Sequence, residues 1–471
     1  MTRKPSRRDL LRLTGAGLAA PFGLSSRPQP NPDPPLGDRP PPPPPSLQIL
    51  NPLDRVPVSL IVDDSTALVN LAHFAIPQFA EVFPSQYRQP WRQLPREIPD
   101  RFVARFAAWC AEHHVRGKYS MVPYPACVGW LDRDLPGWSK AQLEASLELV
   151  RRELLPAWDI HPEMVSHTWA IDTRTGRPLA DRSQDAMENW GFSQNKSADE
   201  LTDYLAYALS ILRNVGLPCA GITTPGGFGS RNLANLSQAV AESVRDIFSA
   251  PIPHYFRHVY EDDRSVAPRV ERASGLDGDD PRCVVSIIGC TGDWFGGWDG
   301  LEPGSADRFL SADGRSGRLA DVIARGEPAV MVGHWPGFYA NGTEHGFRVF
   351  QDVVARLETH AADRLIWMNL SELARYWAAR ELTRIEADAD PATHRTQAVR
   401  FIAPFPCPGF TLRIHQPAGS VLRLATATAL RPLASVENRR CLQPGTTCQD
   451  GNALLVCFDL PRGSSTLQVG R

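Results

Sequence analysis

The chain alternates short apolar runs with amphipathic helical patterns over most of its length. Seven of these runs have the composition of buried strands, and helical patterns separate most of them. Such alternation is typical of parallel strands joined by crossover helices. We therefore expect an α/β fold, a (β/α) barrel of about seven parallel strands, with a doubly wound open sheet as the alternative. The expected strands are 58–62, 118–122, 163–167, 219–223, 283–288, 328–332 and 364–368.

Composition and motifs exclude several classes of protein. The chain has 50 basic and 52 acidic residues, a net charge of -2, and no long basic tract, which argues against a nucleic-acid binder. No G-x-G-x-x-G follows the first expected strand, and G-x-x-x-x-G-K-[ST] is missing from the sequence, so we expect no nucleotide cofactor. No uninterrupted apolar run of about 18 residues occurs, which excludes a protein with several membrane spans.

The N-terminus has the pattern of an export signal. Arg7 and Arg8 precede a short apolar run over residues 13–24, which resembles a twin-arginine signal. We expect a signal over residues 1–26, recognition by the twin-arginine export machinery, and a location in the periplasm or cell envelope. A cytosolic chain with a basic start is the alternative. Residues 27–47, which include the run Pro40–Pro45, are expected to form an extended linker.

Two folded parts are expected after the linker. The strand and helix alternation covers residues 48–386 and predicts the barrel. Within it, Ser139 with Gln142 and Ser197 with Glu200 are capping boxes that predict the starts of two helices. Residues 387–471 contain short alternating runs typical of a small β domain. There, Cys441 and Cys448 flank a Pro-Gly turn and are candidates for a disulfide. The absence of a C-x-x-C pair argues against a thiolate zinc cluster.

Polar residues gather where the expected strands end. In a parallel barrel the loops after the strands build the active site. Neighbouring carboxylates on an extended chain point in different directions, so one of an adjacent pair can bind a metal while the other acts as a base. Two His or His/Asp groups at other strand ends would complete a metal site with an open position for water. These strand-end groups are Asp63 and Asp64, then His161, His167 and Asp172, then residues 223–227, then Asp293 and Trp294, and finally His334 and Trp335.

The order of these groups resembles the polysaccharide deacetylases of the glycoside hydrolase/deacetylase barrel superfamily. In that family a strand ends in Asp-Asp, and the resemblance implies that Asp63 is the general base and Asp64 a metal ligand. The family motif H-[ST]-x-x-H is matched by His167 and Thr168, but Ile171 takes the place of the second histidine. The resemblance then leaves Asp172 or His161 as the third ligand of a divalent metal, with zinc expected.

The remaining motifs of the family are matched in part. In R-x-P-x-G, Pro225 and Gly227 are present and threonine replaces the arginine. Asp293 and Trp294 resemble the motif that orients the base and lines the groove, and His334 resembles the histidine that protonates the leaving group. Three tryptophans in or near strand-end loops are expected to line a sugar groove. These are Trp294, Trp298 and Trp335.

The resemblance implies an exported, metal-dependent hydrolase that removes acyl groups from a polysaccharide or oligosaccharide. Two alternatives remain open at the level of sequence. One is a metal-free glycoside hydrolase that uses carboxylates such as Asp63 and Asp293. The other is a catalytically inactive carbohydrate-binding protein of the cell envelope.

Overall fold

The computed structural model describes residues 35–389, 396–415 and 420–470. The expected signal over residues 1–26 lies outside the described residues, so the twin-arginine and export interpretations stay predictions. In the part of the chain that is described, no helix is long and apolar enough to cross a membrane.

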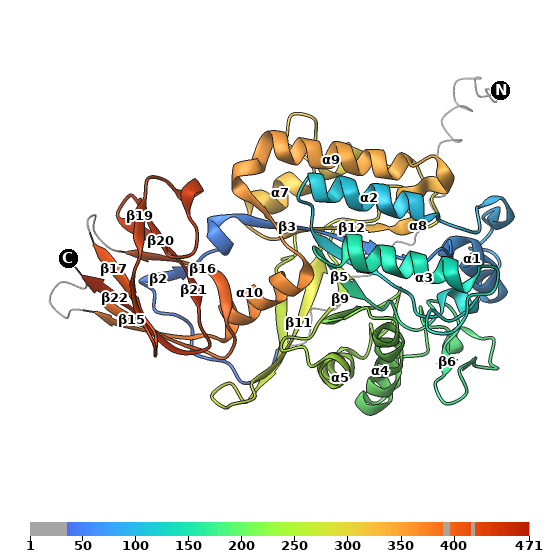
Figure 1. The fold of residues 1–471 in the computed structure, drawn as a ribbon, viewed down its shortest axis with the longest axis horizontal. Helices are drawn as coiled ribbons and strands as arrows, with labels where there is room; N and C mark the ends of the chain where they lie inside the picture. The colour runs from blue at the N-terminus through green and yellow to red at the C-terminus, as the bar shows by residue number, and fades with distance from the viewer. Residues whose placement is uncertain (1–34, 390–395, 416–419, 471) are drawn as a thin grey trace, which may run out of the picture.

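The α/β part of the protein contains two five-stranded sheets (Figure 1). In the first, the order is β12-β3-β4-β5 with β13 also paired to β3, and every pair is parallel. In the second, the order is β1-β10-β11-β9-β8, where β10 and β11 are antiparallel and the other pairs are parallel. The bounds are β1 Leu36–Gly37, β3 Val56–Asp63, β4 Gly117–Ser120, β5 Trp158–His161, β8 Gly221–Thr223, β9 His254–Val259, β10 Arg269–Ser274, β11 Arg282–Gly289, β12 Ala329–His334 and β13 Leu365–Trp367.

The expected closed barrel is not formed by these ladders. The two sheets meet at two seams that carry few backbone hydrogen bonds. At one seam Thr223 donates to Pro162 at 3.0 Å, and at the other Cys290 donates to Val330 at 2.8 Å. Pro162 has no N–H to donate, and β8 is only three residues long, so a regular ladder cannot form between β5 and β8.

One expected strand needs correction, and two strands were missed. Residues 163–167 are a loop, and the strand in this region is β5, which ends at His161. Two strands of the second sheet were not expected from the sequence: β9, which is parallel to β11 and β8, and β10, which is antiparallel to β11.

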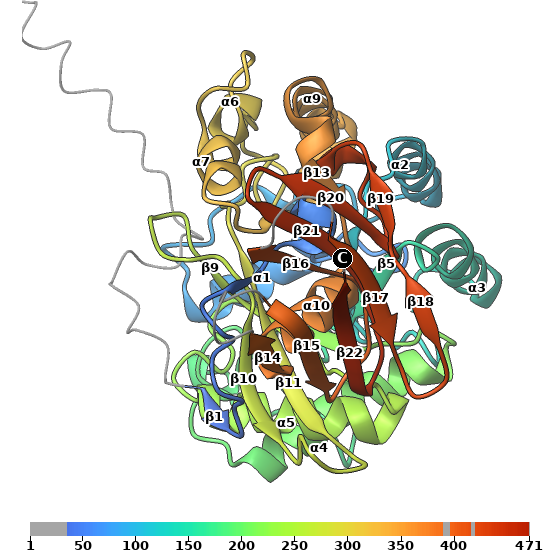
Figure 2. The same ribbon diagram turned by 90° about the vertical axis from the view of Figure 1, so that its left-hand side faces the viewer.

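Helices surround the strands, as Figure 2 shows for α2, α3, α4, α5, α7 and α9. Both expected capping boxes are confirmed, because Ser139 caps α3 through the backbone of Gln142 and Ser197 caps α4 through that of Glu200. The bounds are α1 Leu71–Val82, α2 Asp100–Glu112, α3 Lys140–Leu149, α4 Ala198–Asn214, α5 Leu233–Phe248, α6 Ala306–Phe309, α7 Arg318–Ala324, α8 Trp335–Tyr339, α9 His345–Ala361 and α10 Leu370–Leu382.

The expected C-terminal β domain consists of two further five-stranded sheets. Their orders are β14-β15-β22-β17-β18 and β19-β20-β21-β16-β2. The strand β2, Leu47–Ile49, lies at the expected start of the barrel but pairs with β16 of this domain. The other bounds are β14 Arg384–Ala389, β15 Thr396–Ala403, β16 Cys407–His415, β17 Val421–Ala425, β18 Leu430–Pro432, β19 Ala434–Val436, β20 Thr446–Asp450, β21 Ala453–Leu460 and β22 Gly463–Gly470.

Helix α10 joins the two parts through one shared apolar core. Its residues Leu370, Leu373 and Trp377 are buried in the same cluster as Ile61 of β3 and Phe410 of β16. In Figure 1 the β domain and α10 lie on one side of the α/β part, while α1 and the hairpin strand β6 (Ile171–Asp172) lie on the other. The amino ends of the parallel strands are therefore covered, and their carboxyl ends face away from the β domain.

Two expectations about the chain outside the barrel are changed by the structure. The described end of the proline-rich segment is not a free spacer, because β1 pairs with β10 and Arg39 donates to the carbonyl of Val270 at 2.7 Å. Cys441 and Cys448 do not form a disulfide. Cys448 packs inward against Leu442 and Leu455, whereas Cys441 is exposed.

Glu381 on α10, the helix that joins the α/β part to the β domain, makes the stability of the protein depend on pH. Burial raises the pKa of Glu381 from 4.5 to about 7. The folded state therefore holds a proton that the unfolded chain releases near pH 4.5, and this contribution to stability is lost as pH rises toward 7. We expect Glu381→Gln to gain roughly 1–3 kcal/mol relative to wild type between pH 5 and 8, measured by denaturant unfolding. Glu112→Gln, at an exposed position of α2, is the control and should show no such trend.

Candidate active site

The expected pair of carboxylates lies at the carboxyl end of β3. Asp63 and His334 face each other in the register of the parallel strands β3 and β12. Asp63 is buried and accepts a hydrogen bond from the buried ammonium of Lys118 on β4. Lys118 also donates to Ser120 Oγ at 2.7 Å and to the carbonyl of Val62 at 3.2 Å. The proposed base is thus fixed by a cation on the neighbouring strand.

Asp64 points away from Lys118 toward the loop that follows β5. Its φ of 58° is in the left-handed region, which turns the chain sharply at the end of the strand. Its backbone N–H donates to Glu163 Oε2 at 2.8 Å. His167 Nε2 lies 2.7 Å from Asp64 Oδ1 and 3.4 Å from Glu163 Oε1. These three buried side chains offer ligand atoms that all lie within 4.8 Å of one another.

The loop that carries Glu163 and His167 is fixed by the buried carboxylate of Glu188. This carboxylate accepts hydrogen bonds from the backbone N–H groups of Val165, Ser166 and His167, the last at 2.5 Å. It also accepts a hydrogen bond from the hydroxyl of Tyr204 on α4. Burial raises the pKa of Glu188 to about 7, although these hydrogen bonds act in the opposite direction. Glu188 therefore holds the backbone of His167, whose φ of 66° is also left-handed.

His334 pairs with the other expected carboxylate, Asp293. Its Nδ1 lies 2.9 Å from Asp293 Oδ2, in the loop after β11. Burial alone would lower the pKa of His334, but the negative charges of Asp293, Asp64 and Asp63 raise it to about 10. His334 is therefore protonated at neutral pH.

Burial and neighbouring charges shift the pKa values of the remaining ionisable groups in different directions. Burial raises the pKa of Asp63 to about 6, even though Lys118 opposes this shift. Burial would also raise the pKa of Glu163, but its contact with His167 and the charge of Lys118 lower it to about 2. Asp64 and Glu163 hold the pKa of His167 well above its usual range, against the effect of burial. The arrangement thus combines an ionised Glu163 with an Asp63 carboxyl group whose pKa is about 6.

The two residues expected to supply the third ligand lie elsewhere. Asp172 is on β6, with its carboxylate 3.6 Å from the exposed Arg174. His161 points into the interior of the α/β part, where its Nε2 lies 3.0 Å from His254 Nε2 and its Nδ1 lies 3.3 Å from Thr223 Oγ1. The structure instead brings Glu163 to Asp64 and His167. Sequence reasoning missed Glu163 because it placed residues 163–167 in a strand, with Glu163 at the wrong end.

Two of the three expected groove tryptophans are core residues. Trp335 is fully buried, with ring centroids 4.8 Å from Phe102 and 5.2 Å from Phe106. Trp298 is also buried, in a cluster with Phe79 and Tyr87. Trp294 is half-buried in the loop after Asp293, with the guanidinium of Arg308 4.3 Å from its ring. Only Trp294 among these three therefore remains a candidate for stacking on a substrate.

The loop after β8 carries the expected Pro225 and Gly227 at the same carboxyl end of the strands. Pro225 is buried, while Gly227 is half-buried and its N–H donates to the carbonyl of Asn189 at 2.7 Å. A bridge between Glu163 and Thr223 joins this loop to the loop of the ligand candidates. The two loops therefore border the same region.

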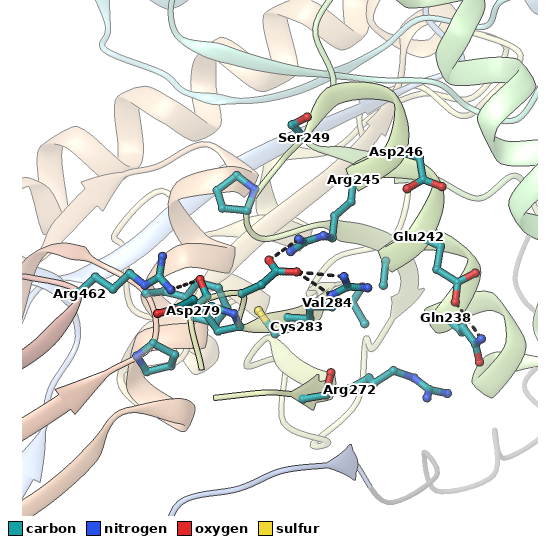
Figure 3. A pocket seen from close by; sticks show the side chains of 18 of the residues that line it. Gln238, Glu242, Arg245, Asp246, Ser249, Arg272, Asp279, Cys283, Val284 and Arg462 are labelled. Carbon is teal, nitrogen blue, oxygen red and sulfur yellow. Dashed lines mark hydrogen bonds and ion pairs between the residues drawn. The ribbon is translucent and has the colours of Figure 1, made fainter. Parts of the chain in front are cut away.

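A separate cavity of about 600 Å³ lies between α5, the β10–β11 hairpin and the C-terminal β domain (Figure 3). It is next to the amino ends of β9 and β11, away from the strand-end residues. Its charged groups largely pair with one another, since Asp280 contacts Arg245 at 2.6 Å and Arg282 at 2.9 Å, and Arg462 donates to the carbonyl of Asp279. We therefore place the candidate active site at the carboxyl ends of the strands.

Comparisons with known proteins give low similarity. No protein-family model matches the sequence, and no curated protein matches it. The overlapping solved structures include a Parabacteroides distasonis protein assigned to the glycoside hydrolases/deacetylases, with 10% identity and a TM-score of 0.35, over 76% of this chain and 80% of the other. A glycoside hydrolase family 30 xylanase from Clostridium acetobutylicum overlaps with 10% identity and a TM-score of 0.31, over 90% and 96% of the two chains.

A third overlap is with a glycoside hydrolase of family 5 from Bacteroides vulgatus. Its identity is 8% and its TM-score 0.31, over 79% of this chain and 86% of the other. Scores this low do not establish a common topology. Function therefore has to be argued from the side chains at the strand ends.

Glu188 should be essential for the order of the β5 loop. Glu188→Ala would leave three buried backbone N–H groups and the Tyr204 hydroxyl without their acceptor, so we expect a loss of roughly 2–4 kcal/mol in the free energy of unfolding. Tyr204→Phe removes one donor to Glu188 and the acceptor of the Ile171 N–H, and should lose about 1–2 kcal/mol. Denaturant unfolding followed by circular dichroism measures both. Equal stability of Glu188→Ala and wild type would contradict this role.

Proposed function

We propose that this protein is a metal-dependent hydrolase that removes acyl groups from a carbohydrate. One observation carries the proposal: Asp64, Glu163 and His167 converge beside Asp63 and His334, which are suited to move protons. The carbohydrate part of the proposal is supported by the resemblance of the strand-end motifs to polysaccharide deacetylases. Export to the periplasm or envelope is part of the same proposal and rests on Arg7 and Arg8.

The three converging side chains fit a divalent metal. Imidazole and carboxylate groups are the ligands that zinc takes in catalytic sites, where three protein ligands leave one position open. Asp64 Oδ1 is buried and, at 2.7 Å from His167 Nε2, has no partner in hydrogen-bond geometry among the residues that the structure describes. His167 would bind through Nε2 and Asp64 and Glu163 through carboxylate oxygens. A divalent ion held there would act as a Lewis acid toward the acyl carbonyl.

Asp63 is suited to accept a proton from water. Its pKa of about 6 leaves most of the group ionised at pH 7, while keeping it basic enough to accept a proton. Lys118 holds one of its oxygens, which orients the other carboxylate oxygen. Burial of both groups excludes bulk water from this contact.

His334 is suited to donate a proton to the departing amine or alcohol. Its protonated form is stabilised by Asp293, which contacts Nδ1 and leaves Nε2 as the donor toward the substrate. Because His334 and Asp63 lie opposite each other on adjacent strands, the base and the acid flank one space. This is the arrangement that acyl transfer to water requires.

Metal binding tests the three converging ligands, in which Glu163 takes the place of the expected Asp172 or His161. Asp64→Asn, Glu163→Gln and His167→Gln should each weaken binding of Zn²⁺ by more than about 100-fold, because each removes one of three protein ligands. Calorimetric titration of chelator-treated protein with Zn²⁺ measures this. Asp172→Asn is the matched control and should bind like wild type. If no preparation binds a divalent metal, the metal-free glycosidase or the inactive binder becomes the better interpretation.

Measurements of kcat should distinguish the residues that transfer protons from the residues that bind the metal. Asp63→Asn and His334→Gln should lower kcat by roughly 10²–10⁴ while Zn²⁺ stays bound, because they remove the base or the acid and no ligand. Acetate release from acetylated chitooligosaccharides and acetylated oligouronates provides the rate. Asp172→Asn again serves as the control. Unchanged kcat in either variant would rule out the role given to that residue.

A further inference from the structure

Arg257 lies at the carboxyl end of β9, in an irregular part of the ladder. The register between β9 and β11 shifts at this point, from Phe256 opposite Ile287 to His258 opposite Ile288. Arg257 is therefore the extra residue of a β-bulge and has no direct partner on β11. Bulges beside active sites commonly redirect a side chain out of the regular alternation.

The guanidinium of Arg257 is buried with most of its hydrogen-bonding capacity unused. The residue is 4% exposed, and its Nη1 donates to the carbonyl of Gly226 at 3.2 Å. Its Nε and Nη2 have no hydrogen-bond partner among the described residues. Burial lowers the pKa of Arg257 to about 10, and no carboxylate among the described residues forms an ion pair with it. A buried cation without an anion is strongly unfavourable, which calls for a partner.

The unpaired atoms indicate the shape of that partner. Nε and Nη2 lie on one edge of the guanidinium plane and present two parallel N–H groups. This edge matches the two oxygens of a carboxylate in a bidentate contact. Nη1, on the other side, is already held by Gly226. The free edge is thus pre-positioned for a planar anion.

Arg257 is close to the proposed catalytic residues along the strand ends. Glu163 bridges to Thr223, and the N–H of Thr224 donates to the carbonyl of Phe256 at 3.1 Å. These contacts form one row across β5, β8 and β9. Two strand spacings of about 4.8 Å place the backbone of β9 roughly 10 Å from that of Glu163. A sugar unit next to the reacting one can bridge that distance.

Asn189 supplies a second unpaired polar group at the same loop. It is 2% exposed, and both its Oδ1 and its Nδ2 have no hydrogen-bond partner among the described residues. Its backbone carbonyl binds Gly227, and its Cβ lies 3.1 Å from the point that a Cβ on Gly226 would occupy. Arg257 and Asn189 therefore both flank Gly226, which is itself exposed. An amide with a free donor and a free acceptor is suited to sugar hydroxyls.

We propose that Arg257, assisted by Asn189, binds the carboxylate of a uronic acid unit, so that the substrate is an acidic polysaccharide. This inference rests on the proposed carbohydrate hydrolase function and names its substrate class. The carboxylate would accept two hydrogen bonds from Nε and Nη2 of Arg257. The acyl group to be removed would then be carried by a neighbouring unit of the same chain.

Binding without turnover tests the proposal independently of the hydrolase activity. A deacylated oligouronate and a neutral oligosaccharide of equal length are titrated into chelator-treated full-length protein. We expect the oligouronate to bind at least about tenfold more tightly, and Arg257→Met to weaken its binding by about 10–100-fold with little effect on the neutral oligosaccharide. Arg257→Lys keeps the positive charge but not the two parallel N–H groups of the guanidinium, and should recover only part of the affinity.

Stability measurements distinguish a binding role of Arg257 from a purely structural one. Because Arg257→Met removes an unpaired buried charge, the Tm of the unliganded variant should equal or exceed that of wild type. If the Tm falls by many degrees, the comparison of Arg257→Lys with wild type decides instead. Equal binding of the two oligosaccharides to wild type, or unchanged oligouronate binding in Arg257→Lys, would overturn the proposal. Equally tight binding of a sulfated oligosaccharide that lacks uronic acid units would overturn the assignment to a carboxylate.

Discussion

The candidate site depends on the compensation of charge among side chains carried by β3, β4 and β12 and by the loops after β3, β5 and β11. Four carboxylates meet three basic side chains there in three contacts. If His167 is neutral, as a metal ligand must be, two negative charges remain uncompensated. That excess equals the charge of a divalent cation. The three contacts are Asp63 with Lys118, His167 with Asp64 and Glu163, and His334 with Asp293.

Protonation of His167 also reduces this excess of negative charge, because its imidazole lies between Asp64 and Glu163. One negative charge remains, and Asp63, with a pKa of about 6, is the group best able to take up a proton. Glu188 is set apart from this balance, since its charge is met by backbone N–H groups and a phenol. The shape of the loop therefore depends on Glu188 rather than on the charge balance of the ligand candidates.

Much of this arrangement could be predicted from the sequence because polar groups at the ends of apolar strands share one edge. Asp63, Asp64 and His334 were found in this way, since β3 and β12 are strongly apolar and end in polar residues. Lys118 was missed because its role depends on a contact with Asp63 on the neighbouring strand, and Glu163 was missed because residues 163–167 were expected to form a strand. Trp335 was misplaced because α8 begins directly after His334 and turns the indole inward. The alternation of elements predicted parallel strands but could not predict whether the ladders close, which depends on local features such as Pro162.

The pairing of β2 with β16 has a consequence for the order in which the protein can fold. Residues 47–49 are synthesised near the beginning of the chain, but their partner strand spans residues 407–415. Strand β2 therefore stays unpaired until residues 407–415 have been synthesised. Contacts this far apart in sequence form slowly, and an unpaired strand is prone to wrong pairing in the meantime. Completion of the β domain is thus a late event that can follow only after residues 407–415 have been synthesised.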